Sequence, residues 1–377
     1  MTDVEVPSIV CPADQNVPSD ANCQFTMLDY TSLAVAADNC DTSVDVTQSP
    51  AVGDVVSGTT TVTLTATDNF GNFSTCTFDL IVIDNTNPII TTCAPDVTEL
   101  VDTNCEVALA DYTSAVVATD NCDLSLTYNQ VPAPGTMFSG HNTVIPVIIT
   151  VTDDSGNSID CSFNVTLEDN IDPTITCPAN ITQTADAGLC SAQVNILVPV
   201  TNDNCSVVSV TNDYTSTNDA SGVYPVGTTT VTYTVIDIAG NTVSCSFDVT
   251  ISDDEQPVIV CPNDVTQTTD AGVCEAAIVV QPMVATDNCA VATIVNDYNN
   301  TSNASDFYPE GTTVVNWTVT DINGNISTCS TTIIVTDNEQ PVIDCPNDIT
   351  QTADAGVCEA LVTVPAMIAT DNCAIAT

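Results

Sequence analysis

The chain has 377 residues, of which 49 are Asp or Glu and none is Lys or Arg, so its formal net charge is −49. Nucleic acids and anionic membranes are recognised largely through Lys and Arg, so this composition excludes nucleic-acid binding and charge-driven membrane binding. Hydrophobic residues make up 44% of the chain, which is too many for a disordered acidic segment. The surface is instead predicted to attract cations, above all hard divalent ones.

Nineteen cysteines recur with a period of about 84 residues, and no Cys-x-x-Cys pair suggests a zinc site. Periodic cysteines of this kind predict disulfides, and therefore a secreted, extracellular protein. No run approaches the roughly 20 apolar residues of a membrane helix, so membrane insertion is not expected.

The period divides the chain into four full repeats and the start of a fifth. We expect repeat one at 1–84, repeat two at 85–169, repeat three at 170–253, repeat four at 254–337, and a truncated repeat five at 338–377. No signal peptide is visible, the first residues resemble the linker at 336–341, and the fifth repeat lacks its fourth cysteine. These features predict that both ends are cuts through a longer array.

Each repeat is predicted to be all-β. A strand that follows the entry proline comes first, and later segments such as 228–236 alternate β-branched and polar residues with period two. Asp-x-x-Gly-Asn turns follow at 68–72, 153–157, 237–241 and 321–325. About seven short strands per repeat indicate an immunoglobulin-like β-sandwich. One core column is expected to run through Leu64, Ile149, Tyr233 and Trp317.

Several motifs together resemble the hyalin repeat (HYR) domain. They are Ile-x-Cys-Pro-x-Asp/Asn-Ile/Val-Thr, Ala-Thr-Asp-Asn-Cys, Tyr-Pro-x-Gly-Thr-Thr-x-Val and Thr-Asp-x-x-Gly-Asn, and they cover essentially the whole chain. Repeats one and two depart from the pattern, with Asp-Tyr-Thr-Ser inserts at 29–32 and 111–114 and no Tyr-Pro-x-Gly. The resemblance implies an immunoglobulin-like fold and extracellular adhesion. It also implies a giant bacterial surface adhesin exported by type IX secretion, and it carries no catalytic residues.

The first and last cysteines of each repeat are predicted to bond. The first strand and the last strand of a repeat run in the same direction, and their cysteines lie at matched distances from the entry proline and the Asp-x-x-Gly-Asn turn. Loops of this size are worth roughly 4 kcal/mol in the chain-entropy model. The predicted disulfides are Cys11–Cys76, Cys93–Cys161, Cys177–Cys245 and Cys261–Cys329, and Cys345 is left without a partner.

The two middle cysteines of each repeat allow two pairings. Cys274 opens a strand at the far end of its repeat, whereas Cys289 lies at the near end. A strand of about seven residues spans roughly 20 Å, too far for a disulfide unless the intervening loop folds back. Sequence locality favours pairing within a repeat, and strand direction favours pairing between repeats, for example Cys190–Cys289. Both pairings remain open at this point.

Acidic residues gather at the predicted joints between repeats. In an immunoglobulin-like sandwich the entering linker meets two loops, and here all three segments are acidic and have no Lys or Arg to pair with. Six to eight such oxygens suit calcium, although solvated turns would show the same composition. The candidate calcium ligands are Asp84, Asp120, Asp153, Asp169, Asp172, Asp203, Asp237, Asp253, Asp254, Glu255, Asp287, Asp321, Asp337 and Asp371.

No enzymatic function is expected. A glycosidase needs one pair of carboxylates in a cleft, whereas these acids recur in every repeat, and the single His141 lies in a turn of one repeat. We predict a stiff structural and adhesive stalk that contacts neighbouring repeats of its own chain. It would belong to a homo-oligomeric fibre, with a surface or matrix ligand at a distal tip. An array of glycan- or matrix-binding modules is the alternative, and exposed clusters of aromatic residues would favour it.

Overall fold

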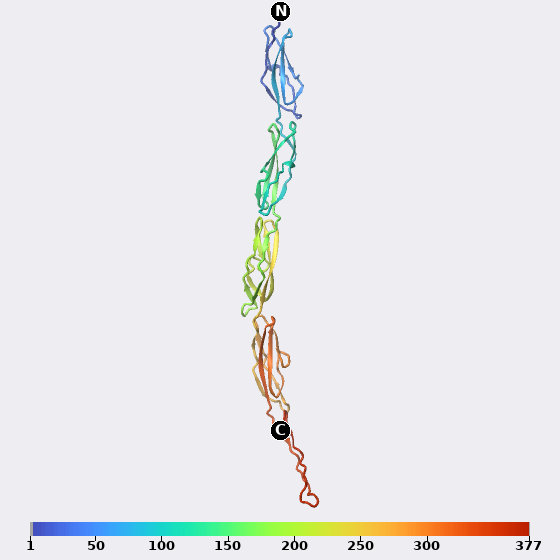
Figure 1. Ribbon diagram of the computed structural model, residues 1–377, viewed down its shortest axis with the longest axis vertical. Helices are drawn as coiled ribbons and strands as arrows, with labels where there is room; N and C mark the ends of the chain where they lie inside the picture. Colours follow the sequence, from blue (N-terminus) through green and yellow to red (C-terminus); the bar gives the residue numbers. More distant parts are fainter. Residues whose placement is uncertain (1–2, 377) are drawn as a thin grey trace. The chain divides into compact units, whose positions relative to one another are not determined.

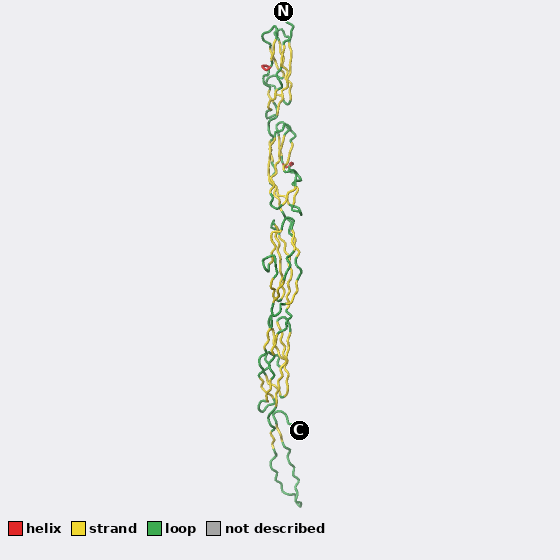
Figure 2. The backbone as a smooth tube through the Cα atoms, turned by 90° about the vertical axis from the view of Figure 1, so that its left-hand side faces the viewer, coloured by secondary structure: helices red, strands yellow, loops and turns green. Residues whose placement is uncertain are grey.

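The structure is a computed structural model that describes residues 3–376. Its helical segments are two short 3-10 turns, η1 Thr31–Leu33 and η2 Thr113–Ala115, drawn red in Figure 2. No helix in the described range is long or apolar enough to cross a membrane. The chain forms two compact units, and the first holds the residues up to Thr174 with Asn202–Val208 and Ile236–Thr242.

Repeats one and two lie in the first unit, and each is a two-layered sandwich (Figure 1). One layer is a four-stranded sheet, ordered β2-β8-β7-β5 in repeat one and β10-β16-β15-β13 in repeat two. The other layer consists of short ladders, β1-β4 with β3-β6 and β12-β9 with β11-β14. In repeat one the strands are β1 Ser8–Val10, β2 Gln15–Pro18, β3 Phe25–Thr26, β4 Val35–Ala37, β5 Asp45–Ser49, β6 Val55–Val56, β7 Thr59–Thr67 and β8 Phe73–Ile83. In repeat two they are β9 Ile89–Thr92, β10 Val97–Leu100, β11 Glu106–Ala108, β12 Val117–Thr119, β13 Thr127–Val131, β14 Met137–Ser139, β15 Val144–Thr152 and β16 Ser158–Glu168.

Repeats three and four have the same sheet orders, β18-β24-β23-β21 and β26-β32-β31-β29, with ladders β17-β20, β19-β22, β25-β28 and β27-β30. Repeat three contains β17 Thr174–Thr176, β18 Ile181–Thr184, β19 Ser191–Val194, β20 Val200–Asn202, β21 Val207–Asn212, β22 Gly222–Pro225, β23 Gly227–Asp237 and β24 Thr242–Ser252. Repeat four contains β25 Val258–Val260, β26 Val265–Thr268, β27 Glu275–Ile278, β28 Val284–Thr286, β29 Val291–Asn296, β30 Asp306–Pro309, β31 Gly311–Asp321 and β32 Ile326–Thr336. Beyond them only β33 Val342–Asp344 and β34 Ile368–Thr370 pair within the described residues.

The alternating sequence pattern places one face of each long strand in the core. In β7, Val62, Leu64 and Ala66 are fully buried, while the threonines between them face away from the core. The predicted core column is confirmed, because Leu64, Ile149, Tyr233 and Trp317 all have an exposed fraction of 0%. Residues of both layers pack around this column, as a two-layered sandwich requires.

The first strand of each repeat changes layers at its cysteine. In repeat four, β25 pairs antiparallel with β28, and the chain then crosses so that β26 runs parallel to the last strand, β32. Cys261 lies at this crossing and is bonded to Cys329 of β32, with a Cα–Cα distance of 6.2 Å. The corresponding bonds in the other repeats are Cys11–Cys76, Cys93–Cys161 and Cys177–Cys245, so the structure joins the same outer pairs that strand direction predicts.

Removing an outer disulfide should destabilise its own repeat. The Cys261→Ala, Cys329→Ala double variant is expected to lose about 4 kcal/mol of unfolding free energy, because the unfolded loop is no longer constrained. Denaturant unfolding monitored by Trp317 fluorescence would report on this repeat directly, since the chain has one Trp. The control is Cys345→Ala, which removes an exposed cysteine that is in no disulfide. Equal midpoints for the two variants would contradict the prediction.

Candidate functional site

The aspartate that follows the last strand is buried in each of the first three repeats. Asp84, Asp169 and Asp253 come directly after β8, β16 and β24, and their exposed fractions are 7%, 3% and 9%. One oxygen of each accepts a backbone N–H two residues further along, from Thr86, Ile171 and Glu255 respectively. The other oxygen, Oδ2 in all three, is buried without a hydrogen-bond partner.

A second carboxylate comes from the loop that the linker meets. Asp120, Asp203 and Asp287 follow β12, β20 and β28, and one oxygen of each accepts the N–H of the cysteine two residues later, at 2.8–3.0 Å. This Asx-type turn fixes the loop, as is usual for an aspartate that bonds to its own backbone. The remaining oxygens, Asp120 Oδ2, Asp203 Oδ1 and Asp287 Oδ1, are also buried and unpartnered.

The third carboxylate organises the Asp-x-x-Gly-Asn turn. Asp321 Oδ1 accepts the backbone N–H groups of Asn323, Gly324 and Asn325, and Oδ2 accepts the Asn325 side-chain amide. Desolvation raises the pKa of Asp321, but these hydrogen bonds outweigh it and hold the pKa below its ordinary value. The Asn325 amide also donates to the backbone carbonyl of Asp253, at 3.2 Å, so the turn is hydrogen-bonded directly to the linker. The corresponding bonds are Asn157–Asp84 and Asn241–Asp169.

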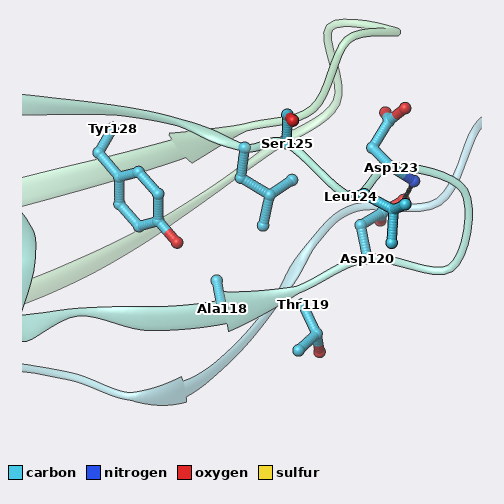
Figure 3. Close-up of a pocket in the computed structure, with 8 residues that line it drawn as sticks. Ala118, Thr119, Asp120, Asp123, Leu124, Ser125 and Tyr128 are labelled. Carbon is cyan, nitrogen blue, oxygen red and sulfur yellow. Dashed lines mark hydrogen bonds between the residues drawn. The ribbon is translucent and has the colours of Figure 1, made fainter.

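These three segments bring carboxylate oxygens to within 4.8 Å of one another. One such group is Asp84, Asp120, Asp123 and Asp153, and another is Asp169, Asp203 and Asp237. Figure 3 shows Asp120 and Asp123 on the loop that follows β12. The sequence has no Lys or Arg to pair with these charges. The geometry therefore provides a cluster of oxygen ligands at these two joints, and at the third joint Asp253 and Asp287 each have a buried oxygen without a partner.

Not every predicted ligand takes part. Asp172 and Asp254 are exposed, and Glu255 instead accepts the backbone N–H of Gly188 from repeat three, at 2.9 Å. At the joint between repeats four and five, Asp337 is half-buried and its carboxylate accepts the Asn372 side-chain amide. The Asp371 carboxylate accepts the backbone N–H of Cys373.

Sequence reasoning missed three aspartates of the clusters, Asp123, Asp3 and Asp38. Asp123 lies one residue beyond Cys122, and it accepts the N–H of Asp154. Asp3 and Asp38 form a further group with Cys40, and alignment of the first linker with the later ones could have indicated it.

The middle cysteines pair between repeats. The bonds are Cys23–Cys122, Cys105–Cys205, Cys190–Cys289 and Cys274–Cys373, with Cα–Cα distances of 4.6–4.8 Å. The sequence left pairing within a repeat and pairing between repeats open, and the structure has the pairing between repeats, which strand direction favoured. We call the segment that carries the earlier cysteine the cysteine turn; the turns are 20–23, 102–105, 186–190 and 270–274.

Each cysteine turn is also held by an asparagine of the following repeat. Asn121 and Asn204 donate their side-chain amides to the carbonyls of Asp20 and Asp102, at 3.2 and 3.0 Å. Asn288 does the same to Leu189 and Asn372 to Val273. Asn204 and Asn288 also donate to the buried linker aspartates, so one amide connects the cysteine turn to the acidic cluster.

The fold and its joints define a class of protein: a tandem array of β-sandwich repeats in which successive repeats share a disulfide beside an acidic cluster. Residues 168–251 and 252–335 match the HYR domain family. This match supports the predicted HYR array over those residues.

The chain is also similar to two curated proteins called hyalin. It is 32% identical to hyalin of Lytechinus variegatus over 326 residues, which is 83% of this chain and 60% of that protein. It is 31% identical to hyalin of Strongylocentrotus purpuratus over 326 residues, which is 82% of this chain and 26% of that protein. The chain thus spans less than two thirds of either relative. Both are sea urchin proteins, so they do not support the predicted bacterial context or type IX secretion.

Among solved structures, the chain is similar to the protocadherin GammaB4 extracellular domain. The identity is 15%, the TM-score is 0.33, and the match covers 93% of this chain and 70% of that one.

Removing an inter-repeat disulfide should loosen the joint and leave the sandwich intact. In a Cys190→Ser, Cys289→Ser variant, we expect faster hydrogen exchange at the Gly188 N–H, which Glu255 accepts, because the cysteine turn can leave the linker. Amides of β31, deep in repeat four, should exchange as before. Unchanged exchange at Gly188 would mean that the hydrogen bonds alone hold the joint.

Proposed function

We propose that the chain is a structural and adhesive segment of an extracellular array, and that its joints bind calcium. One observation carries the proposal: each of the three joints between full repeats holds two buried carboxylate oxygens that have no hydrogen-bond partner. Burying an unpaired charge is strongly unfavourable, and buried polar atoms in folded proteins nearly always have partners. The chain itself has no Lys or Arg to supply one.

The ligand chemistry favours calcium over other metals. The candidate ligands are carboxylates, joined by the side-chain oxygens of Asn121, Asn204 and Asn288, which are likewise buried and unpartnered. The neighbouring cysteines are in disulfides, so soft thiolate ligands are not offered. Calcium accepts six to eight such oxygens in irregular geometry, whereas magnesium demands a near-octahedral site and retains water. Extracellular modules of this kind bind calcium with dissociation constants of about 10⁻⁴–10⁻³ M.

A bound ion would stiffen the array because its ligands come from two repeats. The linker aspartate ends the last strand of one repeat, and the two loop aspartates belong to the next. An ion supplies the positive charge that these carboxylates lack, so mutual repulsion becomes attraction across the joint. This supports the stiff stalk that the sequence predicts.

The proposed role is mechanical and not catalytic. The same carboxylates, asparagines and cysteine turns recur at successive joints with the same partners, which suits a repeated connection better than a single reaction centre. The eight disulfides suit an oxidising, extracellular compartment, and the similarity to hyalin supports secretion. Neighbouring repeats are the first partners, and a homo-oligomeric fibre with a distal ligand extends the same proposal. The bacterial surface context stays a prediction from the sequence.

Calcium binding can be tested by a substitution that should change the melting temperature in opposite directions without and with calcium. In a chelator, the Asp253→Asn, Asp287→Asn double variant should melt at a higher temperature than the unaltered chain, because like charges no longer repel. In millimolar calcium it should melt at a lower temperature, because the unaltered chain gains about 1.4 kcal/mol per site at ten times the dissociation constant. Differential scanning calorimetry measures both conditions.

The matched control is Asp254→Asn, which removes one charge from the same linker at an exposed position. It should leave the response to calcium unchanged. If calcium shifts no melting temperature and small-angle scattering detects no stiffening, the joints are not calcium sites.

A second candidate function is glycan or matrix binding. Phe70 lies within the Asp-x-x-Gly-Asn turn of repeat one and Phe73 directly follows it, and they are 56% and 61% exposed, which is unusual for aromatic residues. Aromatic faces stack on sugars, so a Phe70→Ala, Phe73→Ala variant should lose glycan-array binding if the turn recognises a glycan. Phe307→Ala, equally exposed in repeat four, is the control. Absence of binding by the unaltered chain would exclude this candidate.

A further inference from the structure

The cysteine turns occur in two forms. Turns 20–23 and 102–105 have four residues, Asp-x-Asn-Cys, and the cysteine itself has positive φ, 60° and 61°. Turns 186–190 and 270–274 have five residues, Asp-Ala-Gly-x-Cys, and the glycine takes the positive φ, 73° and 72°. The five-residue form therefore offers an additional backbone N–H, that of the glycine, to the following repeat.

The linkers that contact the two forms of the cysteine turn also differ from each other. Glu255 accepts the N–H of Gly188 at 2.9 Å, and Glu339 accepts the N–H of Gly272 at 3.0 Å. The linkers that receive the four-residue turns have Thr86 and Ile171 at the aligned position, two residues after the buried aspartate. Glutamate in the linker is thus paired with glycine in the cysteine turn. We call this pairing, which is based on a charge-assisted hydrogen bond, the recognition rule.

Repeat one carries the same receiving surface at its near end. We define it by Asp3, Glu5, Asp38, Asn39 and Cys40. The Cys40 N–H is accepted by Asp38 at 2.8 Å, as at the other joints, and the Asn72 amide donates to the Asp3 carbonyl at 3.3 Å. Among the described residues Cys40 is exposed and in no disulfide, and Asp3 Oδ2 is a buried oxygen without a partner.

One contact of this surface differs from the occupied joints. At the other joints the asparagine before the cysteine donates to a carbonyl of a docked cysteine turn, whereas Asn39 donates to Glu5 of its own linker. Asn39 and Glu5, the two side chains that would form hydrogen bonds with an incoming turn, are therefore hydrogen-bonded to each other. Because the linker residue is Glu5, the recognition rule specifies the five-residue form of the turn.

We propose that this receiving surface binds the Asp-Ala-Gly-x-Cys turn of another HYR-type repeat and is closed by a disulfide at Cys40. Continuity with four occupied joints of the same chain supports this pairing, which does not depend on calcium. The occupant that we propose and test is the turn 354–358 of a second copy. That turn has the five-residue sequence, its Val357 N–H already bonds to the Asp354 carbonyl, and Cys358 is exposed and unbonded.

The bond would form by thiol–disulfide exchange. The Cys40 thiolate attacks a small-molecule disulfide such as oxidised glutathione and releases one glutathione thiolate. The Cys358 thiolate then attacks the mixed disulfide at the Cys40 sulfur and releases the second. Two protein thiols are oxidised, one glutathione disulfide is reduced to two thiols, and the two protein protons pass to solvent or to the leaving thiolates.

A mixing experiment tests the pairing. Two variants are prepared in a Cys345→Ser background: one with Cys40→Ser, which retains Cys358, and one with Cys358→Ser, which retains Cys40. They are mixed in a glutathione redox buffer containing a chelator, and dimers are analysed by non-reducing electrophoresis and peptide mapping. We expect the Cys40–Cys358 heterodimer to exceed the homodimers by roughly tenfold, the factor that one charge-assisted hydrogen bond can supply. A statistical mixture of the three dimers, or no dimer, would overturn the proposal.

The recognition rule has its own test. Glu5→Thr, which copies the linker of repeat two, should reduce the heterodimer by roughly tenfold, because the glycine N–H loses its acceptor. Replacing Asp-Ala-Gly-Val-Cys at 354–358 by Asp-Ala-Asn-Cys in the partner copy should restore it. Asp45→Asn, an exposed charge on the same repeat, is the control and should change nothing. Equal yields with Glu5→Thr and Asp45→Asn would overturn the proposed role of Glu5.

Discussion

The buried aspartate at the end of each of the first three repeats is the residue on which the joints between full repeats depend. Asp169, for example, bonds to its own linker backbone and to Asn204 of the next repeat, and Asn204 in turn holds the cysteine turn of the repeat before. Its backbone carbonyl accepts Asn241 from the Asp-x-x-Gly-Asn turn. A charge buried among donors from both sides of a joint makes the orientation of that joint specific, because any other arrangement would leave more polar atoms unpaired.

The inter-repeat disulfide and the acidic cluster have complementary effects. Carboxylates gathered within 4.8 Å repel each other, and a covalent bond between neighbouring repeats holds them together against that repulsion. The disulfide ensures proximity, and a cation would then decide whether the joint is strained or clamped. Because the sequence has no Lys or Arg to compete for the carboxylates, the calcium binding that we propose would recur at successive joints along an array.

The two forms of the cysteine turn indicate that joints can differ within one fold. A positive φ is needed in both forms, and it falls either on the cysteine or on a glycine two residues before it. In the glycine form the turn is one residue longer, and the glycine N–H donates to a linker glutamate, Glu255 or Glu339. A change in turn length thus accompanies a change in the linker residue that bonds to the turn, within the same sandwich.

Periodicity and strand direction were sufficient to predict the repeat, the all-β class, the core column through Leu64 and Trp317, and the outer cysteine pairs. The tertiary structure was needed for the middle pairs, since locality and strand direction predicted different partners for Cys190. It also separated the buried Asp253 from the exposed Asp254, and it revealed Asp123. Adjacent acids look alike in a sequence, whereas burial and hydrogen bonding depend on which side of the linker each side chain faces.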